Sequence, residues 1–244
     1  MSSTPPSPGL VDDLVLANHI LFDQGVVDAF GHVSARHDRC ADRFLLSRNM
    51  APGLVSAADI VEFTLDGEAV NAAGRRVYLE RFIHGEIYRA YPQVQAIVHS
   101  HSPAIVPLTV VKNHSLRAVF HMAGFIGTDA PVFEIREEAG DATDLLIRNG
   151  QLGAALARHF ENSAIVLMRG HGSTVVAQSV QQAVYRAVYA EANARCQATA
   201  EQLGDVTYLT DAECRACVDS HEAQVQRPWD MWKLQAAKNR SAQQ

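Results

Sequence analysis

The sequence predicts a layered α/β protein whose central sheet is mixed or antiparallel. Segments with helical periodicity flank several short β-like runs along the 244 residues. The runs do not alternate strictly with helices, as a purely parallel sheet built from strand–helix–strand units would require. Because neither an internal repeat nor an interior linker is visible, we expect residues 9–244 to form a single domain.

The first third of the chain is expected to hold a leader, one helix and three strands. Residues 1–8, rich in serine and proline, have the composition of a disordered leader. In residues 9–24 leucine and alanine recur at helical spacing, and Gly25 is the expected stop. The β-like runs that follow lie at 31–36, 43–47 and 60–65, and the turn Asp66-Gly67 closes the last of them.

The remaining elements are predicted from the same periodicities. A helix at 78–91 should stop at Pro92, because proline disfavours a helical residue before it. Apolar runs predict strands at 93–101, 117–125 and 164–169. Helices are expected at 145–160 and 181–203, and the C-terminal part, which carries Trp229 and Trp232, should also be helical.

Composition narrows the class of protein. A chain with 48% hydrophobic and 20% charged residues is typical of soluble globular proteins. The net charge of −6 argues against nucleic acid or an anionic membrane as a partner. No apolar stretch reaches the roughly 18 residues of a membrane span, and the N-terminus lacks the features of a signal peptide.

The cysteines favour a reducing compartment. Four cysteines are too few and too clustered for a secreted disulfide framework, so we expect a cytoplasmic protein. Cys214 and Cys217 form a C-x-x-C pair, but no second pair completes a zinc site. We therefore interpret them as ordinary thiols on a helix.

The segment Ala96-Ile-Val-His-Ser-His-Ser102 is the most informative part of the sequence. Alternate side chains of a strand leave the same face, so His99 and His101 should point together and offer half of a metal site. The alternative is that one histidine packs in the sheet while the other faces solvent. His171, between Gly170 and Gly172 at the end of another apolar run, lies where small neighbours let a ligand approach.

A carboxylate completes the predicted set. Glu80 is expected near the start of the helix at 78–91, and it could bind a metal at rest, then act as base or acid when substrate displaces it. His84, four residues on, either orients Glu80 or simply packs. Three imidazoles and one carboxylate suit Zn, Mn, Fe or Co, so the ligand types do not select the metal.

These residues resemble a known family. Leu79-Glu-Arg-Phe-Ile-His84, Ile97-Val-His-Ser-His101, Arg169-Gly-His-Gly172 and Phe30-Gly-His-Val-Ser-Ala-Arg36 are similar to motifs of the class II aldolase/adducin family, over roughly residues 10–205. The resemblance implies a three-layer α/β/α sandwich and a homotetramer with active sites at subunit interfaces. It also implies a divalent ion held by Glu80, His99, His101 and His171.

Departures from the family pattern point to the substrate. Where sugar-phosphate members cradle a phosphate, this chain has His32, the Ser47-Arg48-Asn49 loop and Tyr78-Leu79, which argues against a phosphate. Arg48 offers a planar fork for a carboxylate, with Ser47 and His32 as further donors, although a plain surface role is the alternative for Arg48. These segments resemble the aromatic decarboxylase branch, which acts on hydroxylated aromatic or pyridine dicarboxylates and implies Mn²⁺, with Zn²⁺ or another divalent metal as alternatives.

The resemblance also indicates a reaction and a proton donor. Aldol cleavage and decarboxylation both leave an electron pair that must be held as an enolate, which a metal on the adjacent oxygen stabilises. The aldolases use a tyrosine from a neighbouring subunit as acid, and the alignment places His121 there; a packed strand histidine is the alternative. Two other functions stay open: an aldolase or epimerase of a sugar phosphate, and a scaffold of the adducin type, whose members typically lack the metal histidines.

Overall fold

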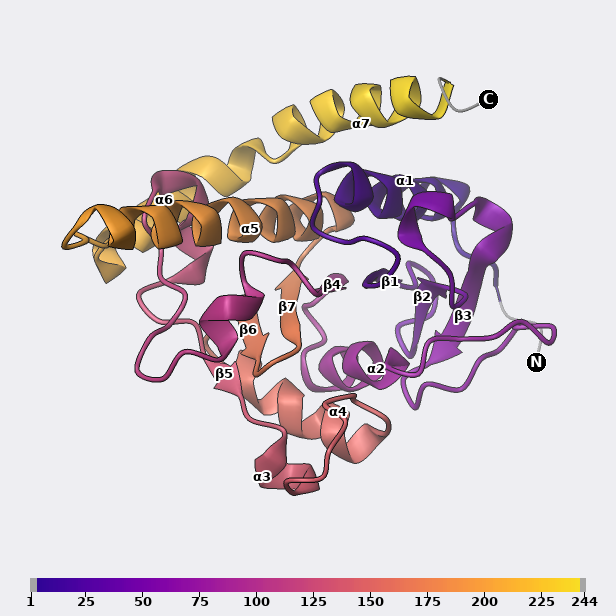
Figure 1. Cartoon of the computed structure of the whole chain (residues 1–244). Coiled ribbons are helices and arrows are strands. Elements are labelled where there is room, and N and C mark those ends of the chain that lie inside the picture. The colour runs from indigo at the N-terminus through magenta and orange to yellow at the C-terminus, as the bar shows by residue number, and fades with distance from the viewer. Residues whose placement is uncertain (1–3, 242–244) are drawn as a thin grey trace.

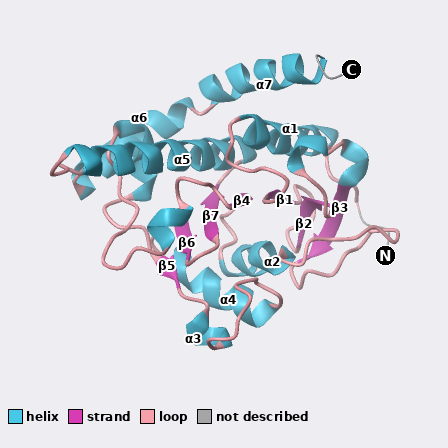
Figure 2. Ribbon diagram, in the orientation of Figure 1, coloured by secondary structure: helices cyan, strands magenta, loops and turns pink. Residues whose placement is uncertain are grey.

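The computed structural model describes residues 4–241 as a seven-stranded sheet with helices on both faces (Figures 1 and 2). The strands are β1 (His32–Arg36), β2 (Arg43–Ser47), β3 (Ile60–Thr64), β4 (Ala96–Ser100), β5 (Val132–Phe133), β6 (Ile165–Met168) and β7 (Gly172–Ala177). The helices are α1 (Pro8–Asp23), α2 (Arg81–Ala90), α3 (Arg136–Ala139), α4 (Gly150–Ala157), α5 (Val180–Leu203), α6 (Asp211–His221) and α7 (Gln226–Ser241).

The sheet is mixed, as predicted. Its strand order is β3-β2-β1-β4-β7-β6-β5, and every neighbouring pair is antiparallel except β5 with β6. Figure 1 shows α1, α5 and α7 on one side of the sheet and α2, α3 and α4 on the other. This arrangement confirms the three-layer α/β/α sandwich.

The two faces of β4 show how the layers are held together. Val98 packs in the core with α1 and α5, whereas its neighbour Ile97 packs in the opposite core with α2 and α4. Adjacent residues of a strand point to opposite faces, so both faces of this central strand are covered. By the same alternation His99 lies on the α2 face, together with Ile97.

Side-chain caps explain where several helices begin. Ser7 accepts a hydrogen bond from the backbone N–H of Leu10 at the start of α1, and Ser179 caps α5 in the same way. Such caps each contribute about 1 kcal/mol to helix stability. The predicted leader, 1–8, includes residues 1–3, which lie outside the described residues, and Pro8 begins α1. The division into leader and single domain stays a prediction.

The strand predicted at 117–125 is wrong. Its backbone is bonded to polar side chains of α5 instead of to a neighbouring strand: the N–H of Arg117 donates to Gln197 and the N–H of Val119 donates to Asn193. The segment then forms a 3-10 helix, η4 (His121–Ile126). Two real strands, β5 and β7, were not predicted.

Two predicted helices begin later than expected. The helix expected from Tyr78 starts at Arg81, and the helix expected from Leu145 starts at Gly150, where Asn149 caps it. The C-terminal part is helical as predicted, and Trp229 and Trp232 of α7 are buried against α1 and α5. Within residues 4–241 no helix is both long and apolar enough to cross a membrane.

Candidate metal centre

His99 and His101 converge at the end of β4. His99 is fully buried between β1 and β7, and His101 follows the last residue of the strand. Their Nε2 atoms are 3.2 Å apart. The two histidines therefore point together, as the alternation of the strand predicts.

His171 joins them from the turn between β6 and β7. Its Nε2 atom lies 3.0 Å from Nε2 of His101. Gly172 makes this approach possible, because a Cβ at that position would lie 2.0 Å from the backbone oxygen of Ser100. Only a residue without a side chain lets the turn lie this close to β4.

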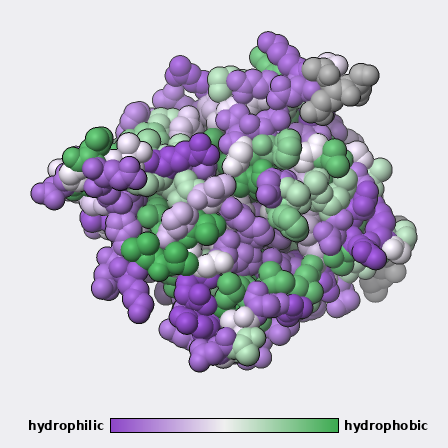
Figure 3. Space-filling model, viewed as in Figure 1, coloured by the Kyte–Doolittle hydropathy of each residue, from purple (hydrophilic) through white to green (hydrophobic). Residues whose placement is uncertain are grey.

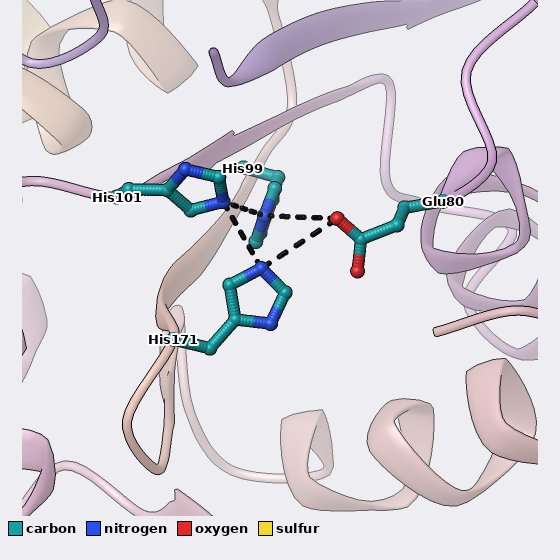
Figure 4. Close-up of side chains that lie close together, drawn as sticks. All are labelled: Glu80, His99, His101 and His171. Carbon is teal, nitrogen blue, oxygen red and sulfur yellow. Dashed lines mark hydrogen bonds and ion pairs between the residues drawn. The ribbon is translucent and has the colours of Figure 1, made fainter. Parts of the chain in front are cut away.

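Glu80 completes the cluster from the opposite side. It is the residue before the first turn of α2, which differs from the prediction that it lies within the helix. Its Oε1 accepts a hydrogen bond of 2.9 Å from the backbone N–H of Ile147. Its Oε2 faces the histidines, 3.5 Å from Nε2 of His171 and 3.8 Å from Nε2 of His99 (Figure 4).

The four residues fit a divalent transition-metal ion. One donor atom from each lies within 4.8 Å of all the others. Two donors about 2.1 Å from one ion lie about 3.0 Å apart at a right angle and about 3.4 Å apart at the tetrahedral angle. The two short separations between Nε2 atoms, 3.0 and 3.2 Å, fall in or at the edge of that range.

Hydrogen bonds and burial prepare the rings to bind a cation. Nδ1 of His171 donates to the Leu145 carbonyl, and Nδ1 of His99 lies 3.2 Å from the Thr174 hydroxyl, which leaves both Nε2 atoms directed inward. Burial, and then the neighbouring rings of His171 and His32, hold the pKa of His99 well below its usual value. His99 is therefore neutral, with a lone pair free for a metal.

Comparison with known proteins decides the family. Residues 12–198 match the profile of the Class II Aldolase and Adducin N-terminal domain. The chain belongs to the class II aldolase and adducin family. A similar solved structure, L-fuculose 1-phosphate aldolase from Glaciozyma antarctica, has a TM-score of 0.78 at 20% identity and covers 98% of this chain and 96% of that chain. This likeness shows that the fold is shared.

Two curated relatives indicate the type of reaction within the family. Decarboxylase tropJ of Talaromyces stipitatus is 40% identical over 237 residues, which cover 88% of this chain and 89% of that protein. The 3,4-dihydroxyphthalate decarboxylase of Arthrobacter keyseri is 30% identical over 194 residues, 74% of each chain. These relatives support an enzyme, and within the class II aldolase family a decarboxylase.

The Thr174 hydroxyl provides a test of how the candidate metal ligands are oriented. Replacing Thr174 by valine keeps the shape of the side chain but removes its contact with Nδ1 of His99. We expect the metal affinity to fall about 10- to 100-fold, because such partners fix the orientation of a ligating imidazole. Metal titration measures this, with Ser173→Ala on the opposite face of β7 as the control. Equal affinities in the two variants would contradict the role of Thr174.

Of the predicted substrate-binding residues, His32 lies beside this cluster. The His32 ring centre is 4.9 Å from that of His99 and 4.7 Å from that of Tyr78. Ser47 is fully buried at the end of β2, and its hydroxyl makes no hydrogen bond within the described residues. Burial raises the pKa of Tyr78, with smaller opposing effects from the Met50 carbonyl, which accepts a hydrogen bond from the Tyr78 hydroxyl, and from the charge of nearby Arg48. His32 therefore contacts the cluster, and Tyr78 connects His32 to the Ser47-Arg48 segment.

Arg48 is partly engaged within the protein. Its Nε donates to Oδ1 of Asp59 at 2.7 Å, and the side chain is 38% exposed. Within residues 4–241 its two terminal nitrogens make no other hydrogen bond, so they stay able to bind an anion. Its role as a substrate contact stays a prediction.

His84 does not orient Glu80. Its Nδ1 lies 2.6 Å from the Ser34 hydroxyl and its Nε2 lies 2.7 Å from Nδ1 of His32, so both ring nitrogens are occupied elsewhere. Sequence reasoning missed Ser34, and it missed Tyr88, whose hydroxyl lies 2.8 Å from that of Ser34. The alternation of β1, which places His32 and Ser34 on one face, was the available signal.

The burial of His84 should make stability depend on pH. Burial lowers its pKa to about 3, whereas an unfolded histidine titrates near about 6.5. Between these values the unfolded chain binds a proton that the folded chain does not, so lowering the pH through this window destabilises the fold by up to about 1.4 kcal/mol per pH unit. The free energy of unfolding, measured with denaturant at several pH values, should depend less steeply on pH in His84→Gln than in His159→Gln. Equal slopes would contradict this assignment.

Within the described residues of one protomer, His121 is not part of the cluster of potential metal ligands. It begins η4, is exposed, and its ring contacts that of His221 at 4.7 Å between centres. The alternative of a packed strand histidine does not hold, because the segment is not a strand. A role as proton donor would require His121 to reach the site of another subunit, and this stays a prediction.

Proposed function

We propose that the protein is a divalent-metal-dependent decarboxylase of a hydroxylated aromatic or pyridine dicarboxylate. The observation that carries the proposal is the cluster of four potential metal donors, Glu80, His99, His101 and His171, with His32 beside it. The two decarboxylase relatives support the type of reaction. The aromatic substrate class follows from the replacement of phosphate-binding positions by His32 and Tyr78.

The four ligands would hold the metal. We propose Mn²⁺, following the decarboxylase branch of the family, with Zn²⁺ as the main alternative because the ligand types accept both. When bound, a divalent ion supplies Lewis-acid stabilisation of negative charge on the oxygen next to the bond that breaks. Oε1 of Glu80 is fixed by the N–H of Ile147, so its Oε2 is the oxygen that either binds the ion or moves a proton.

The neighbouring side chains would hold the carboxylate that is retained. The terminal nitrogens of Arg48 supply a positive, planar donor group, and the unpaired Ser47 hydroxyl and the His32 ring supply further contacts. This places the other carboxylate near the metal cluster. Its bond to the ring then breaks, CO₂ leaves, and the electron pair on the ring carbon takes up a proton.

We propose that a neighbouring subunit supplies this proton through His121, within a homotetramer. Several large apolar side chains are exposed, among them Phe30, Val110 and Val111. The face in Figure 3 also carries separate hydrophobic patches between hydrophilic ones. Apolar surface of this kind is typical of subunit contacts. Light scattering of the purified protein tests the tetramer, and a monomer with full activity would contradict the role of His121.

A substrate screen tests the function as a whole. The metal is removed with a chelator, Mn²⁺ or Zn²⁺ is added back, and CO₂ release is measured with hydroxylated benzene and pyridine dicarboxylates. A panel of sugar phosphates is tested in parallel for retro-aldol products. We expect CO₂ from the first panel only with metal present. Cleavage of a sugar phosphate without CO₂ release from any aromatic acid would overturn the proposal.

Replacing Arg48 by lysine tests the carboxylate clamp. An ammonium is a point charge and cannot reproduce the planar fork, so we expect the KM for the aromatic acid to rise about tenfold, roughly the effect of one charged hydrogen bond. The control is Arg43→Lys at the other end of β2, where Nη1 of Arg43 pairs with Glu62 at 2.5 Å. An unchanged KM in Arg48→Lys would count against the clamp.

A further inference from the structure

We propose that Ser34 and His84 act as positioning residues that fix the tautomer of His32, so that His32 presents an N–H group to an anionic oxygen of the substrate. The inference rests on the proposed function in one respect, namely that His32 contacts the substrate. It adds the direction of the hydrogen bond that His32 offers, and it assigns a role to a buried polar chain that the metal cluster does not use.

The chain consists of four buried side chains from β1 and α2. The Tyr88 hydroxyl lies 2.8 Å from Oγ of Ser34, Oγ lies 2.6 Å from Nδ1 of His84, and Nε2 of His84 lies 2.7 Å from Nδ1 of His32. None of the four residues is more than 3% exposed. Because Tyr88, Ser34 and His84 lie at the closed end of the chain, away from the metal cluster, each of their protons needs a partner within the chain, whereas Nε2 of His32 ends it and is not among the fully buried unpartnered atoms of the described residues.

The hydroxyl end sets the direction of the chain. Within residues 4–241 the Tyr88 hydroxyl has one hydrogen-bond partner, Ser34, and the Arg36 guanidinium over its ring can only donate. Tyr88 therefore donates to Ser34, and Ser34 donates to Nδ1 of His84. The reverse direction would leave a buried hydroxyl proton without an acceptor, which is unfavourable.

The direction at Ser34 then determines both histidines. Burial lowers the pKa of His84 to about 3, so near neutral pH its ring carries a single proton. Since Nδ1 accepts from Ser34, that proton is on Nε2 and is donated to Nδ1 of His32. Nδ1 of His32 must therefore accept this hydrogen bond and cannot carry a proton of its own. His32 carries its proton on Nε2.

The location of His32 gives this tautomer a use. Its ring lies between the ring of His99, a metal ligand, and that of Tyr78, which lies among the anion-binding residues. Nε2 of His32 has no hydrogen-bond partner within the described residues, so its N–H is available to a ligand. An N–H donates to a carboxylate or phenolate oxygen, whereas a bare nitrogen would place its lone pair against the anion.

Histidine NMR tests the tautomer directly. In the Zn²⁺-loaded protein, which is diamagnetic, long-range ¹H–¹⁵N correlation of labelled histidine should show His32 with its proton on Nε2. Ser34→Ala removes the hydroxyl that directs His84, so a population with the proton on Nδ1 of His32 should appear. Tyr88→Phe is the matched control, because Ser34 still has only His84 to donate to and the tautomer should not change.

Affinity for a carboxylate gives a second measurement. Unsubstituted phthalate serves as the probe in calorimetry with the Zn²⁺-loaded protein. If the donor tautomer falls to between half and a tenth of the molecules, the apparent Kd rises about two- to tenfold in Ser34→Ala, and Tyr88→Phe stays near the wild-type value. A structural role for Ser34 alone would not change the tautomer.

The measurement of the His32 tautomer is independent of the test of the proposed function. His32 with its proton on Nδ1 in the wild-type protein would overturn the inference, and this measurement decides even if Ser34→Ala does not fold. A tautomer unchanged in Ser34→Ala, or changed in Tyr88→Phe alone, would also overturn it. Failure to release CO₂ from any aromatic acid would remove the proposed function but would leave the measured tautomer as it is.

Discussion

His99→Ala and His171→Ala should each abolish metal binding and decarboxylation while the protein stays folded. Each change removes one of three Nε2 donors. Nε2 of His101 lies 3.2 Å from Nε2 of His99 and 3.0 Å from Nε2 of His171. Loss of a residue that only orients a ligand weakens metal binding about 10- to 100-fold, so loss of a ligand should cost more than about 100-fold. The folded state should persist because the removed rings are held mainly by polar contacts at the end of the sheet.

The experiment measures metal content after dialysis and add-back, CO₂ release, and circular dichroism for each variant. His159→Ala is the control, because that ring bonds to the Ala155 carbonyl in α4 and takes no part in the cluster. Full metal occupancy in both ligand variants would refute the assignment. Loss of metal together with loss of helical signal would show unfolding instead, and the Thr174→Val titration would then provide the test.

The local part of this site could be predicted from sequence. His99 and His101 are two residues apart in a strand, and the period of a strand alone places both side chains on one face. The same holds for the helices α1 and α5, whose apolar spacing is regular over many residues. Predictions of this kind need only the conformation of the segment itself.

Features that depend on distant partners could not be predicted. The segment 117–125 has the apolar pattern of a strand, but Asn193 and Gln197 of α5 bond its backbone. The direction of the Glu80 carboxylate depends on the N–H of Ile147, which is 67 positions away. His84 bonds to Ser34 and His32 on β1, so its spacing from Glu80 along the helix carried no information.

Glu80→Gln should lower kcat about 10²- to 10⁴-fold if Glu80 moves a proton during the reaction. The amide oxygen can still accept the N–H of Ile147, so the side chain should keep its orientation and the fold should not change. The amide nitrogen would then take the place of Oε2 opposite His99 and His171, where it has neither negative charge nor a lone pair to offer. Metal binding should weaken but persist, because three imidazoles remain.

Metal titration separates the two roles of Glu80. If the carboxylate only binds the ion, saturating metal should restore kcat in Glu80→Gln to the wild-type value. If it also carries a proton, kcat should stay low at saturating metal, and the pH dependence of kcat should lose one limb. Glu86→Gln on the same helix is the control, since Glu86 pairs with Arg89. Wild-type kcat and wild-type metal affinity together in Glu80→Gln would exclude both roles, and the cation would then depend on the three histidines alone.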